Sequence, residues 1–348
     1  MKLSSLIKGT PIKRLDGRSI TDDDGIERLR DLNTEISSLH SRAQNVKPGG
    51  LFVAIKGCAA DGHDYIEQAV KNGAAAVITH KPATVPSGVL SVEVTNSRAA
   101  LASLASRFYG APSEKLMVIG ITGTNGKTTT SYIIESILRQ AGKTVGVVGT
   151  INYRFAGKEY ANPVTTPESL DLQRILKKML DAGVTHVVLE VSSHALDLHR
   201  IDGCFMDAAV FTNLSQDHLD YHKDMADYWA CKKRLFTEVL LSGPKRDHAL
   251  AIINANDPKG RELKEVKDLK RLMVGDSDGN DMWAESTEQN LYGLSGKICT
   301  PSNRFDFQSP LVGIHNLENI LCAAGVGHAL GIPPKVIKAG IEDLSLIH

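Results

Sequence analysis

Short apolar runs and amphipathic stretches alternate along most of this 348-residue chain. The runs that predict buried strands are 51–55, 75–79, 89–94, 116–121, 144–148, 186–191, 208–211 and 249–254. The stretches that predict helices are 64–72, 97–109, 131–140, 170–181 and 317–329. Strands that alternate with helices favour a mostly parallel sheet with helices on both faces, so the predicted fold class is α/β. Ligands of such sheets bind at the carboxyl ends of the strands.

Capping residues and glycines set the expected helix ends. Thr166-Pro167 fits the N-cap and first position of the 170–181 helix, and Gly183 fits its end. A serine can cap the 97–109 helix. Residues 1–40 are polar and predict no strong strand, whereas 276–310 predict a hairpin excursion.

The chain is long enough for two domains, each with its own core. The stretch Gly110-Ala-Pro-Ser113 resembles a linker. We therefore predict a small N-terminal α/β domain over 1–112 and a larger α/β domain over 113–345.

Composition excludes several classes of protein. Forty basic and forty acidic residues give zero net charge, so no basic patch argues for nucleic acid or a membrane surface. The five scattered cysteines (Cys58, Cys204, Cys231, Cys299 and Cys322) predict reduced thiols in a cytoplasm. Residues 1–10 carry no secretion signal, and no run reaches the ~20 apolar residues of a membrane span.

The main chemical signal is Gly120-Ile-Thr-Gly-Thr-Asn-Gly-Lys-Thr-Thr-Thr130. A strand, a glycine turn with Gly-Lys-Thr and a helix are the elements that bind nucleotide phosphates. Gly123 and Gly126 admit backbone N–H groups to the phosphate, Lys127 adds charge, and the Thr128 hydroxyl can bind Mg²⁺. The common loop has a glycine five residues before the Gly-Lys glycine, where this chain has Ile121, so the working unit begins at Gly123.

Four further clusters follow predicted strands or open helices. Glu190 can face the magnesium of Thr128, or can be a solvated strand-end carboxylate. His218 lies among acids in 212–222 and suggests a cation site, whereas His222 and Asp220 can equally make local turn contacts. Lys232 lies on a predicted helix, where a surface lysine is the ordinary interpretation. His315 or Asn316 can cap the 317–329 helix, and Asn316 and Asn319 share one face that can contact a base or phosphate.

In order, these clusters resemble the Mur ligases. The matching segments are Gly123-Thr-Asn-Gly-Lys-Thr-Thr129, Thr165-Thr-Pro-Glu168, Glu190-Val-Ser-Ser-His-Ala-Leu196, Arg200, Asn213–His222 and His315-Asn-Leu-Glu-Asn319. Ser41-Arg42, Pro48-Gly49, Leu51–Ala54, Gly57 and Asp61-Gly-His63 resemble the UDP-binding domain of that family. The resemblance covers essentially the whole chain and rests on the combination of motifs.

The resemblance implies an ATP-dependent ligase that adds the third residue, meso-diaminopimelate or L-lysine, to the peptidoglycan precursor UDP-N-acetylmuramoyl-L-alanyl-D-glutamate. ATP converts a substrate carboxylate to an acyl phosphate, and an amine then attacks it. ATP, two Mg²⁺ ions, the UDP-sugar dipeptide and a diamino acid are the implied ligands, and a monomer is expected.

The resemblance also assigns roles to residues. The implied ATP-binding residues are Gly123, Thr124, Asn125, Gly126, Lys127, Thr128, Thr129, Asn316 and Asn319. The implied substrate-binding residues are Ser41 on the uridine side and Thr165, Thr166, Ser192 and Arg200 at the peptide end. Thr128 and Glu190 would bind one Mg²⁺, and His218 would help to bind the second. Lys127, His218 and Lys232 are the implied catalytic residues.

Lys232 matches the family position at which CO₂ carbamylates a lysine. A carbamate replaces a cation by an anion that can bind Mg²⁺, and its formation needs a neutral amine and hence a depressed lysine pKa.

Family members carry a third domain after the segment that resembles 335–344, and we expect this chain to lack it. It would then bind the UDP-sugar peptide and ATP but turn over poorly, because closure of that domain completes the site. Alternatives are a folylpolyglutamate synthase-like ligase, which lacks an N-terminal domain such as 1–112, and a non-catalytic nucleotide- or UDP-sugar-binding module. A phosphate-loop kinase or GTPase is disfavoured by the loop spacing and the missing Asn-Lys-x-Asp motif.

Overall fold

The computed structural model describes residues 1–20, 32–57 and 60–344 in two compact units. The first unit comprises Met1–Ala111, Glu168–Lys177 and Leu198–Gly203. The second comprises Pro112–Pro167, Lys178–Asp197 and the chain from Cys204 onward. Two short segments thus belong to the first unit although they follow the predicted boundary at 112. Cys58 and residues 345–348 lie outside the described residues.

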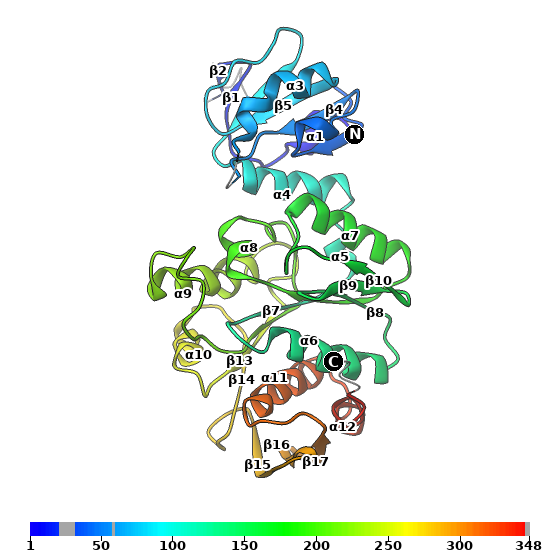
Figure 1. The fold of residues 1–348 in the computed structure, drawn as a ribbon, viewed down its shortest axis with the longest axis vertical. Helices are drawn as coiled ribbons and strands as arrows, with labels where there is room; N and C mark the ends of the chain where they lie inside the picture. Colours follow the sequence, from blue (N-terminus) through cyan, green and yellow to red (C-terminus); the bar gives the residue numbers. More distant parts are fainter. Residues whose placement is uncertain (21–31, 58–59, 345–348) are drawn as a thin grey trace. The chain divides into compact units, whose positions relative to one another are not determined.

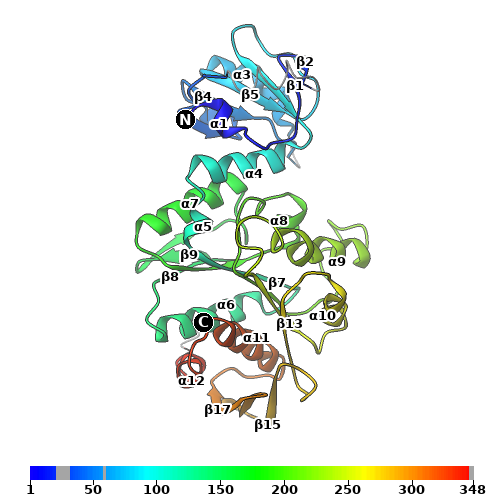
Figure 2. The same ribbon diagram turned by 180° about the vertical axis from the view of Figure 1, so that it is seen from behind.

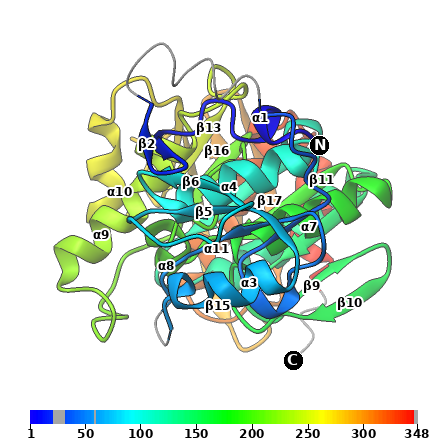
Figure 3. The same cartoon turned by 90° about the horizontal axis from the view of Figure 1, so that it is seen from above.

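The first unit is built on a sheet with the strand order β2-β1-β6-β5-β4-β3. Its strands are β1 (Ile12–Leu15), β2 (Arg18–Ser19), β3 (Ser38–His40), β4 (Gly50–Val53), β5 (Ala74–Thr79) and β6 (Leu90–Val94). β3 to β6 are parallel, and β1 pairs antiparallel with both β6 and β2. Figure 3 looks onto this unit and shows β5 and β6 side by side.

Helices complete the first unit and enclose its apolar core. They are α1 (Leu3–Leu6), α3 (Ile66–Lys71) and α4 (Ser97–Phe108), with short 3₁₀ turns at Ala43–Asn45 and Gly62–Tyr65. Leu3, Leu51, Ile78 and Leu101 are among the core side chains without exposed surface. Residues 1–40 were predicted to contain no strong strand, but β1, β2 and β3 lie there. They give little signal in the sequence, because they are short and expose most of their polar side chains.

The second unit contains a large mixed sheet with the order β10-β9-β8-β11-β7-β12-β13-β14-β15-β16-β17. The strands are β7 (Met117–Thr122), β8 (Val145–Val148), β9 (Asn152–Phe155), β10 (Lys158–Ala161), β11 (His186–Glu190), β12 (Ala208–Phe211), β13 (Leu250–Asn254), β14 (Arg271–Gly275), β15 (Met282–Asn290), β16 (Gly293–Thr300) and β17 (Asn303–Ser309). The central strands, in the order β8-β11-β7-β12-β13-β14-β15, are parallel to one another. Antiparallel strands extend the sheet at both edges, β9 and β10 beside β8, and β16 and β17 beside β15.

The sheet is covered by helices on both faces. The helices from residue 112 onward are α5 (Pro112–Lys115), α6 (Lys127–Gln140), α7 (Ser169–Asp181), α8 (Ser193–Asp197), α9 (Met225–Arg234), α10 (Pro258–Glu262), α11 (His315–Ala329) and α12 (Pro334–Glu342), with a π-helical turn at Leu235–Val239 and a 3₁₀ turn at Leu263–Glu265. Figures 1 and 2 show α6, α11 and α12 on one face of the sheet and α8 on the other. The predicted α/β class is confirmed.

Two features of this unit differ from what the sequence predicts. Residues 276–310 do form antiparallel hairpins, as predicted, but they are not an excursion, because β15 pairs with β14 and extends the main sheet through β16 and β17. The β9–β10 hairpin was not predicted, because its strands are only four residues each and contain no continuous apolar run. Among the helices of residues 1–20, 32–57 and 60–344, none combines the length and apolarity needed to cross a bilayer.

Two helices begin differently from the prediction. α7 starts at Ser169, so Thr166 is not its N-cap, and its hydroxyl instead donates to the carbonyl of Glu190. α11 starts at His315 after Ile314, and no side chain caps it, so the predicted cap at His315 or Asn316 was wrong. The predicted end of α7 is confirmed by Gly183, whose φ of 79° lies in the left-handed region.

The N-cap of α4 is Asn96 rather than a serine. The Asn96 side chain accepts from the backbone N–H groups of Arg98 and Ala99, at 2.9 and 3.2 Å. We expect Asn96→Ala to lower the free energy of unfolding by about 1 kcal/mol, because two helix-end donors lose their acceptor. Urea denaturation of the purified chain measures this change. Thr95→Ala is the comparison, because Thr95 is exposed and adjoins the cap. A loss from Thr95→Ala as large as that from Asn96→Ala would contradict the assignment.

Candidate active site

The glycine loop lies between β7 and α6, at the carboxyl end of the central strand. β11 and β12 flank β7 in parallel, with Glu190 opposite Ile121 and Phe211 opposite Thr122. The residues that follow these three strands therefore meet at one edge of the sheet. The loop backbone is fixed there, because Thr124 N donates to the Asn213 carbonyl at 2.9 Å and Asn125 N to the Asn213 side chain at 2.9 Å.

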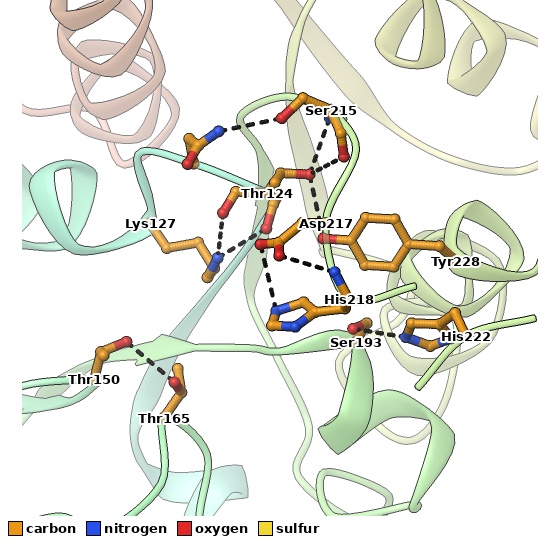
Figure 4. Close-up of polar contacts among 12 residues, drawn as sticks. Thr124, Lys127, Thr150, Thr165, Ser193, Ser215, Asp217, His218, His222 and Tyr228 are labelled. Atoms are coloured by element: carbon orange, nitrogen blue, oxygen red, sulfur yellow. Dashed lines mark hydrogen bonds and ion pairs between the residues drawn. The ribbon is translucent and has the colours of Figure 1, made fainter. Parts of the chain in front are cut away.

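Side-chain hydrogen bonds also connect the loop to the end of β12 and the segment that follows it. The Thr212 hydroxyl donates to the Asn125 carbonyl at 2.7 Å. The Thr124 hydroxyl contacts the Ser215 carbonyl at 3.1 Å and the Tyr228 hydroxyl at 3.2 Å, and it accepts from Ser215 N. Figure 4 shows Thr124, Ser215 and Tyr228 in this network. The loop thus has a fixed backbone before any ligand arrives.

Both glycines are required by the geometry. A Cβ on Gly123 would lie 1.9 Å from the Thr212 hydroxyl, and one on Gly126 would lie 2.1 Å from Asn319 Oδ1. Gly126 also has a φ of 84°, in the left-handed region. Glycine at these positions therefore lets the loop pack against Thr212 and Asn319 as it leads into the N-terminus of α6, where anions bind.

We expect Gly126→Ala to destabilise the chain by roughly 1 kcal/mol more than Gly142→Ala. Both positions have left-handed backbones, whose cost to alanine is about 1–2 kcal/mol. Only Gly126 adds a clash, since nothing lies within 4 Å of a Cβ on Gly142. Urea denaturation of the two variants measures the difference. Equal losses would show that Asn319 moves aside without cost.

Two lysine ammonium groups share one carbonyl. Lys127 Nζ donates to the carbonyls of Gly123 and Thr124, at 2.9 and 2.8 Å, and Lys232 Nζ donates to the Gly123 carbonyl at 2.8 Å. Burial lowers the pKa of Lys127. Burial and the nearby charge of Lys127 lower the pKa of Lys232 well below its ordinary value. Burial and the like charge of a neighbouring lysine both favour a neutral amine on Lys232.

Lys232 is not a surface lysine. It lies on α9, is 1% exposed, and its Nζ stands 4.6 Å from the centroid of the Tyr228 ring. The predicted helix is confirmed, but the surface interpretation was wrong, because α9 presents this position to the loop.

Glu190 is buried at the end of β11, so the interpretation as a solvated strand-end carboxylate was wrong. It accepts from the Thr128 hydroxyl at 3.0 Å and from the Thr150 hydroxyl at 2.8 Å. Thr150 N also donates to it, at 3.3 Å. Thr150 was not singled out from the sequence, although its place directly after the strand 144–148 was a signal.

The two histidines that follow β12, His218 and His222, differ in their exposure and contacts. His218 is 41% exposed with a φ of 53°, and its Nε2 lies 3.6 Å from Asp217. His222 is buried, with Nε2 2.9 Å from the Ser193 hydroxyl and Nδ1 3.3 Å from Asp227. Figure 4 shows His218 beside Asp217 and His222 beside Ser193. Asp220 is exposed.

Lys232 and His218 adjoin the same aromatic ring. The His218 and Tyr228 ring centroids are 6.1 Å apart, and Lys232 Nζ lies over Tyr228. Residues 1–20, 32–57 and 60–344 contain no ready-made cluster of three His, Cys, Asp or Glu side chains for a metal. A cation here would therefore need oxygen ligands from threonine, water or a bound ligand as well.

Three predicted substrate residues lie near Glu190. Thr165 and Thr150 have their hydroxyls 3.1 Å apart (Figure 4). The buried Thr166 hydroxyl donates to the Glu190 carbonyl at 2.8 Å and accepts from Ser192 N at 3.1 Å. The Ser192 hydroxyl accepts from Ala195 N at 3.2 Å, at the start of α8. Thr166 thus ties Ser192 to the strand that bears Glu190.

Asn316 and Asn319 lie at the start of α11 against the loop. Asn319 donates to Asn316 Oδ1 at 2.9 Å, and its own Oδ1 accepts from the Thr130 hydroxyl at 3.3 Å. Asn316 donates to the Val312 carbonyl at 2.9 Å. The two amides are nearly buried, and they brace the Gly126 turn.

The remaining predicted residues, Ser41 and Arg200, belong to the first unit. Ser41 lines a cavity of about 470 Å³ together with Phe52, Tyr65, Arg98 and Glu168. Arg200 Nη2 lies 2.9 Å from Glu168 Oε1. Arg98 and Glu168 were not predicted as site residues, and Arg98 gives no signal in the sequence beyond its place at the start of a helix.

Comparison with known proteins places the chain in a family. The family model described as Mur ligase middle domain matches residues 121–327, and the one described as Mur ligase family, catalytic domain, matches residues 35–109. A UDP-N-acetylmuramoyl-L-alanyl-D-glutamate--2,6-diaminopimelate ligase of Geobacter metallireducens is 45% identical over 89% of this chain and 61% of its own length. The ligase of that name from Geobacillus thermodenitrificans is 41% identical over 90% of this chain and 64% of its own.

Comparison with solved structures also finds a ligase of this name. A UDP-N-acetylmuramoyl-L-alanyl-D-glutamate--2,6-diaminopimelate ligase shares 26% identity with a TM-score of 0.76, over 88% of this chain and 61% of that one. A Mycobacterium tuberculosis folylpolyglutamate synthase shares only the fold, at 18% identity, a TM-score of 0.57 and 70% of this chain. The chain spans 61% of the length of the Geobacter metallireducens relative. The middle-domain match covers more than half of the chain, and the chain therefore belongs to the Mur ligase family.

Proposed function

We propose that this chain binds ATP and UDP-N-acetylmuramoyl-L-alanyl-D-glutamate and contributes the carboxylate-activating part of a ligase that adds 2,6-diaminopimelate. Family membership and the names of the relatives support the reaction and the substrate. The observation that carries the proposal is the meeting of Lys127, Lys232 and the Thr128–Glu190 pair around one glycine loop.

The loop fits a nucleotide phosphate. Gly123 and Gly126 have no room for a Cβ on their packed side, and the 14-residue helix α6 begins at Lys127. Its first N–H groups and the Lys127 ammonium supply positive charge at one point. We propose that Gly123 to Thr129 contact the phosphates, and that Asn316 and Asn319 act by bracing the Gly126 turn.

The oxygen atoms at Glu190 fit Mg²⁺, which prefers carboxylate and hydroxyl oxygens with water and phosphate. We propose that Thr128 and Glu190 hold one ion, with Thr150 orienting the carboxylate through its 2.8 Å contact. His218 and a carbamylated Lys232 are proposed for a second ion, beside Tyr228.

The chemistry supplied by ATP is transfer of its γ-phosphoryl group to a substrate carboxylate, which gives an acyl phosphate. The protein needs to offset negative charge and to position groups, because the reaction requires no protein nucleophile. Lys127 offsets charge on the phosphates. Thr165, Thr166, Ser192 and Arg200 are proposed for the peptide end, and Ser41 for the uridine side.

Hydroxylamine trapping tests the proposal. Excess chain is mixed with ATP, Mg²⁺, UDP-N-acetylmuramoyl-L-alanyl-D-glutamate and hydroxylamine, which attacks an acyl phosphate to release phosphate and form a hydroxamate. We expect one hydroxamate for each ADP formed, and neither product with UDP-N-acetylmuramoyl-L-alanine, which lacks the glutamate. ADP release that is independent of the sugar nucleotide, or hydroxamate formation without ATP, would contradict the proposal.

A further inference from the structure

The first unit contains a cluster of two arginines around one glutamate. Arg98 Nη1 lies 3.2 Å from Glu168 Oε2, and Arg200 Nη2 lies 2.9 Å from Glu168 Oε1. The side chains of Arg98, Glu168 and Arg200 are 16%, 32% and 15% exposed. Each carboxylate oxygen therefore serves a different guanidinium group, and the cluster keeps one excess positive charge.

The two arginines are anchored differently. Arg98 stands in the first turn of α4, and its Nη2 also donates to the Lys56 carbonyl at 2.9 Å. Arg200 comes from the short segment Leu198–Gly203. The neighbouring His199 has a φ of 54°, and its Nδ1 lies 2.6 Å from Asp202. Since Oε2 holds Arg98, Glu168 can release Arg200 from Oε1 without leaving Arg98.

Glu168 and Arg98 both line the 470 Å³ cavity that Ser41 also lines. Arg42 lines the same cavity, so its wall carries one excess positive charge, and Arg200 adjoins the wall through its ion pair with Glu168. Such a wall favours an anionic ligand, and a planar guanidinium pairs best with a carboxylate. A ligand carboxylate at Arg200 would stand beside Glu168 and be repelled by it. Glu168 must then give up its contact with Arg200.

We infer that Glu168 is a built-in competitor for the ligand carboxylate: it pairs with Arg200 when the site is empty and yields Arg200 to the ligand while it keeps Arg98. The inference rests on the proposed function for the identity of the ligand, the glutamate end of the UDP-sugar dipeptide. Glu168 is a positioning residue in this scheme, and it sets affinity for acidic ligands.

Calorimetric titration of the 348-residue chain tests the competition. The ligands are UDP-N-acetylmuramoyl-L-alanyl-D-glutamate and UDP-N-acetylmuramoyl-L-alanine, which lacks the glutamate carboxylates. We expect Glu168→Gln to bind the dipeptide ligand about fivefold more tightly, the upper end for a partly exposed ion pair. Affinity for the alanine ligand should change by less than about twofold.

Glu67→Gln is the matched control, because it removes the same charge from an exposed position of the same unit. It should change neither affinity. Weaker binding of the dipeptide ligand by Glu168→Gln would overturn the inference, since Glu168 would then orient Arg200 for the ligand. Equal changes for both ligands would also overturn it, since the effect would then be general electrostatics.

A second measurement needs no sugar nucleotide. Phenylglyoxal modifies accessible arginines, and peptide mass spectrometry reports each site. We expect Glu168→Gln to speed labelling of Arg200 several-fold, because the variant removes the carboxylate that pairs with it. Unchanged labelling of Arg200 refutes the inference even if the chain binds the ligand. Failure of both ligands to bind, with faster Arg200 labelling, contradicts the proposed function and leaves the Glu168–Arg200 exchange supported.

Discussion

Lys127→Ala is expected to lower the single-turnover rate of hydroxamate formation by roughly 10²–10³-fold, the loss typical of removing one preorganised group that stabilises charge. The Lys127 ammonium lies on the carbonyls of Gly123 and Thr124, at the start of α6, where the phosphates would bind. No other described lysine except Lys232 contacts the Gly123 carbonyl. The variant should also bind ATP more weakly, as calorimetry would report.

The fold should tolerate this change. Burial already lowers the pKa of Lys127, so the folded chain carries this charge at a cost that alanine removes. Lys143→Ala is the matched control, because Lys143 is exposed just beyond the end of α6. A Lys127→Ala chain that keeps both its melting temperature and its hydroxamate rate would show that the loop backbone alone stabilises the transferred phosphoryl group.

The loop and the strands that carry it were predictable from the sequence. Buried parallel strands are continuous apolar runs, so β7, β11 and β12 are visible before folding, and polar residues that follow them must meet at one edge. The same pattern places Glu190 at the end of β11, but it does not distinguish a buried carboxylate from a solvated one. Edge strands give weaker signals: β10 exposes Lys158 and Glu159, and the strands of residues 1–40 are only two to four residues long.

Side chains on helices were harder to assign. Lys232 lies between Cys231 and Lys233, and nothing in that spacing distinguishes a buried lysine from an exposed one. Its environment is set by distant residues, since the Gly123 carbonyl and the Lys127 charge come from the β7–α6 loop. The Arg98–Glu168–Arg200 cluster likewise joins three separate segments of chain.

The two lysines should not act independently. They share the Gly123 carbonyl, and the charge of Lys127 disfavours the charged form of Lys232. Removing Lys127 favours the charged form of Lys232 and so opposes its carbamylation. The losses from Lys127→Ala and Lys232→Ala should therefore be less than additive when the two are combined, as for groups that act as a unit.

Lys232→Ala is expected to lower hydroxamate formation by roughly 10²–10³-fold, and short carboxylic acids should restore part of the rate. Lys232 is 1% exposed, so alanine leaves a cavity beside Tyr228 and the Gly123 carbonyl. Formate or acetate in that cavity would return the negative charge that a carbamate supplies. Mass spectrometry alone is a weaker test, because the carbamate is easily lost.

The compound that restores activity to Lys232→Ala shows which charge the lysine supplies. If the lysine acts as a carbamate, acetate restores activity and methylamine does not. If it acts as an ammonium ion, methylamine restores activity and acetate does not, and the proposed carbamate is wrong. Lys233→Ala is the matched control, because Lys233 is the next residue on α9 and only half-buried. An undiminished rate in Lys232→Ala would exclude both roles, and the depressed pKa of Lys232 would then be only a consequence of its burial.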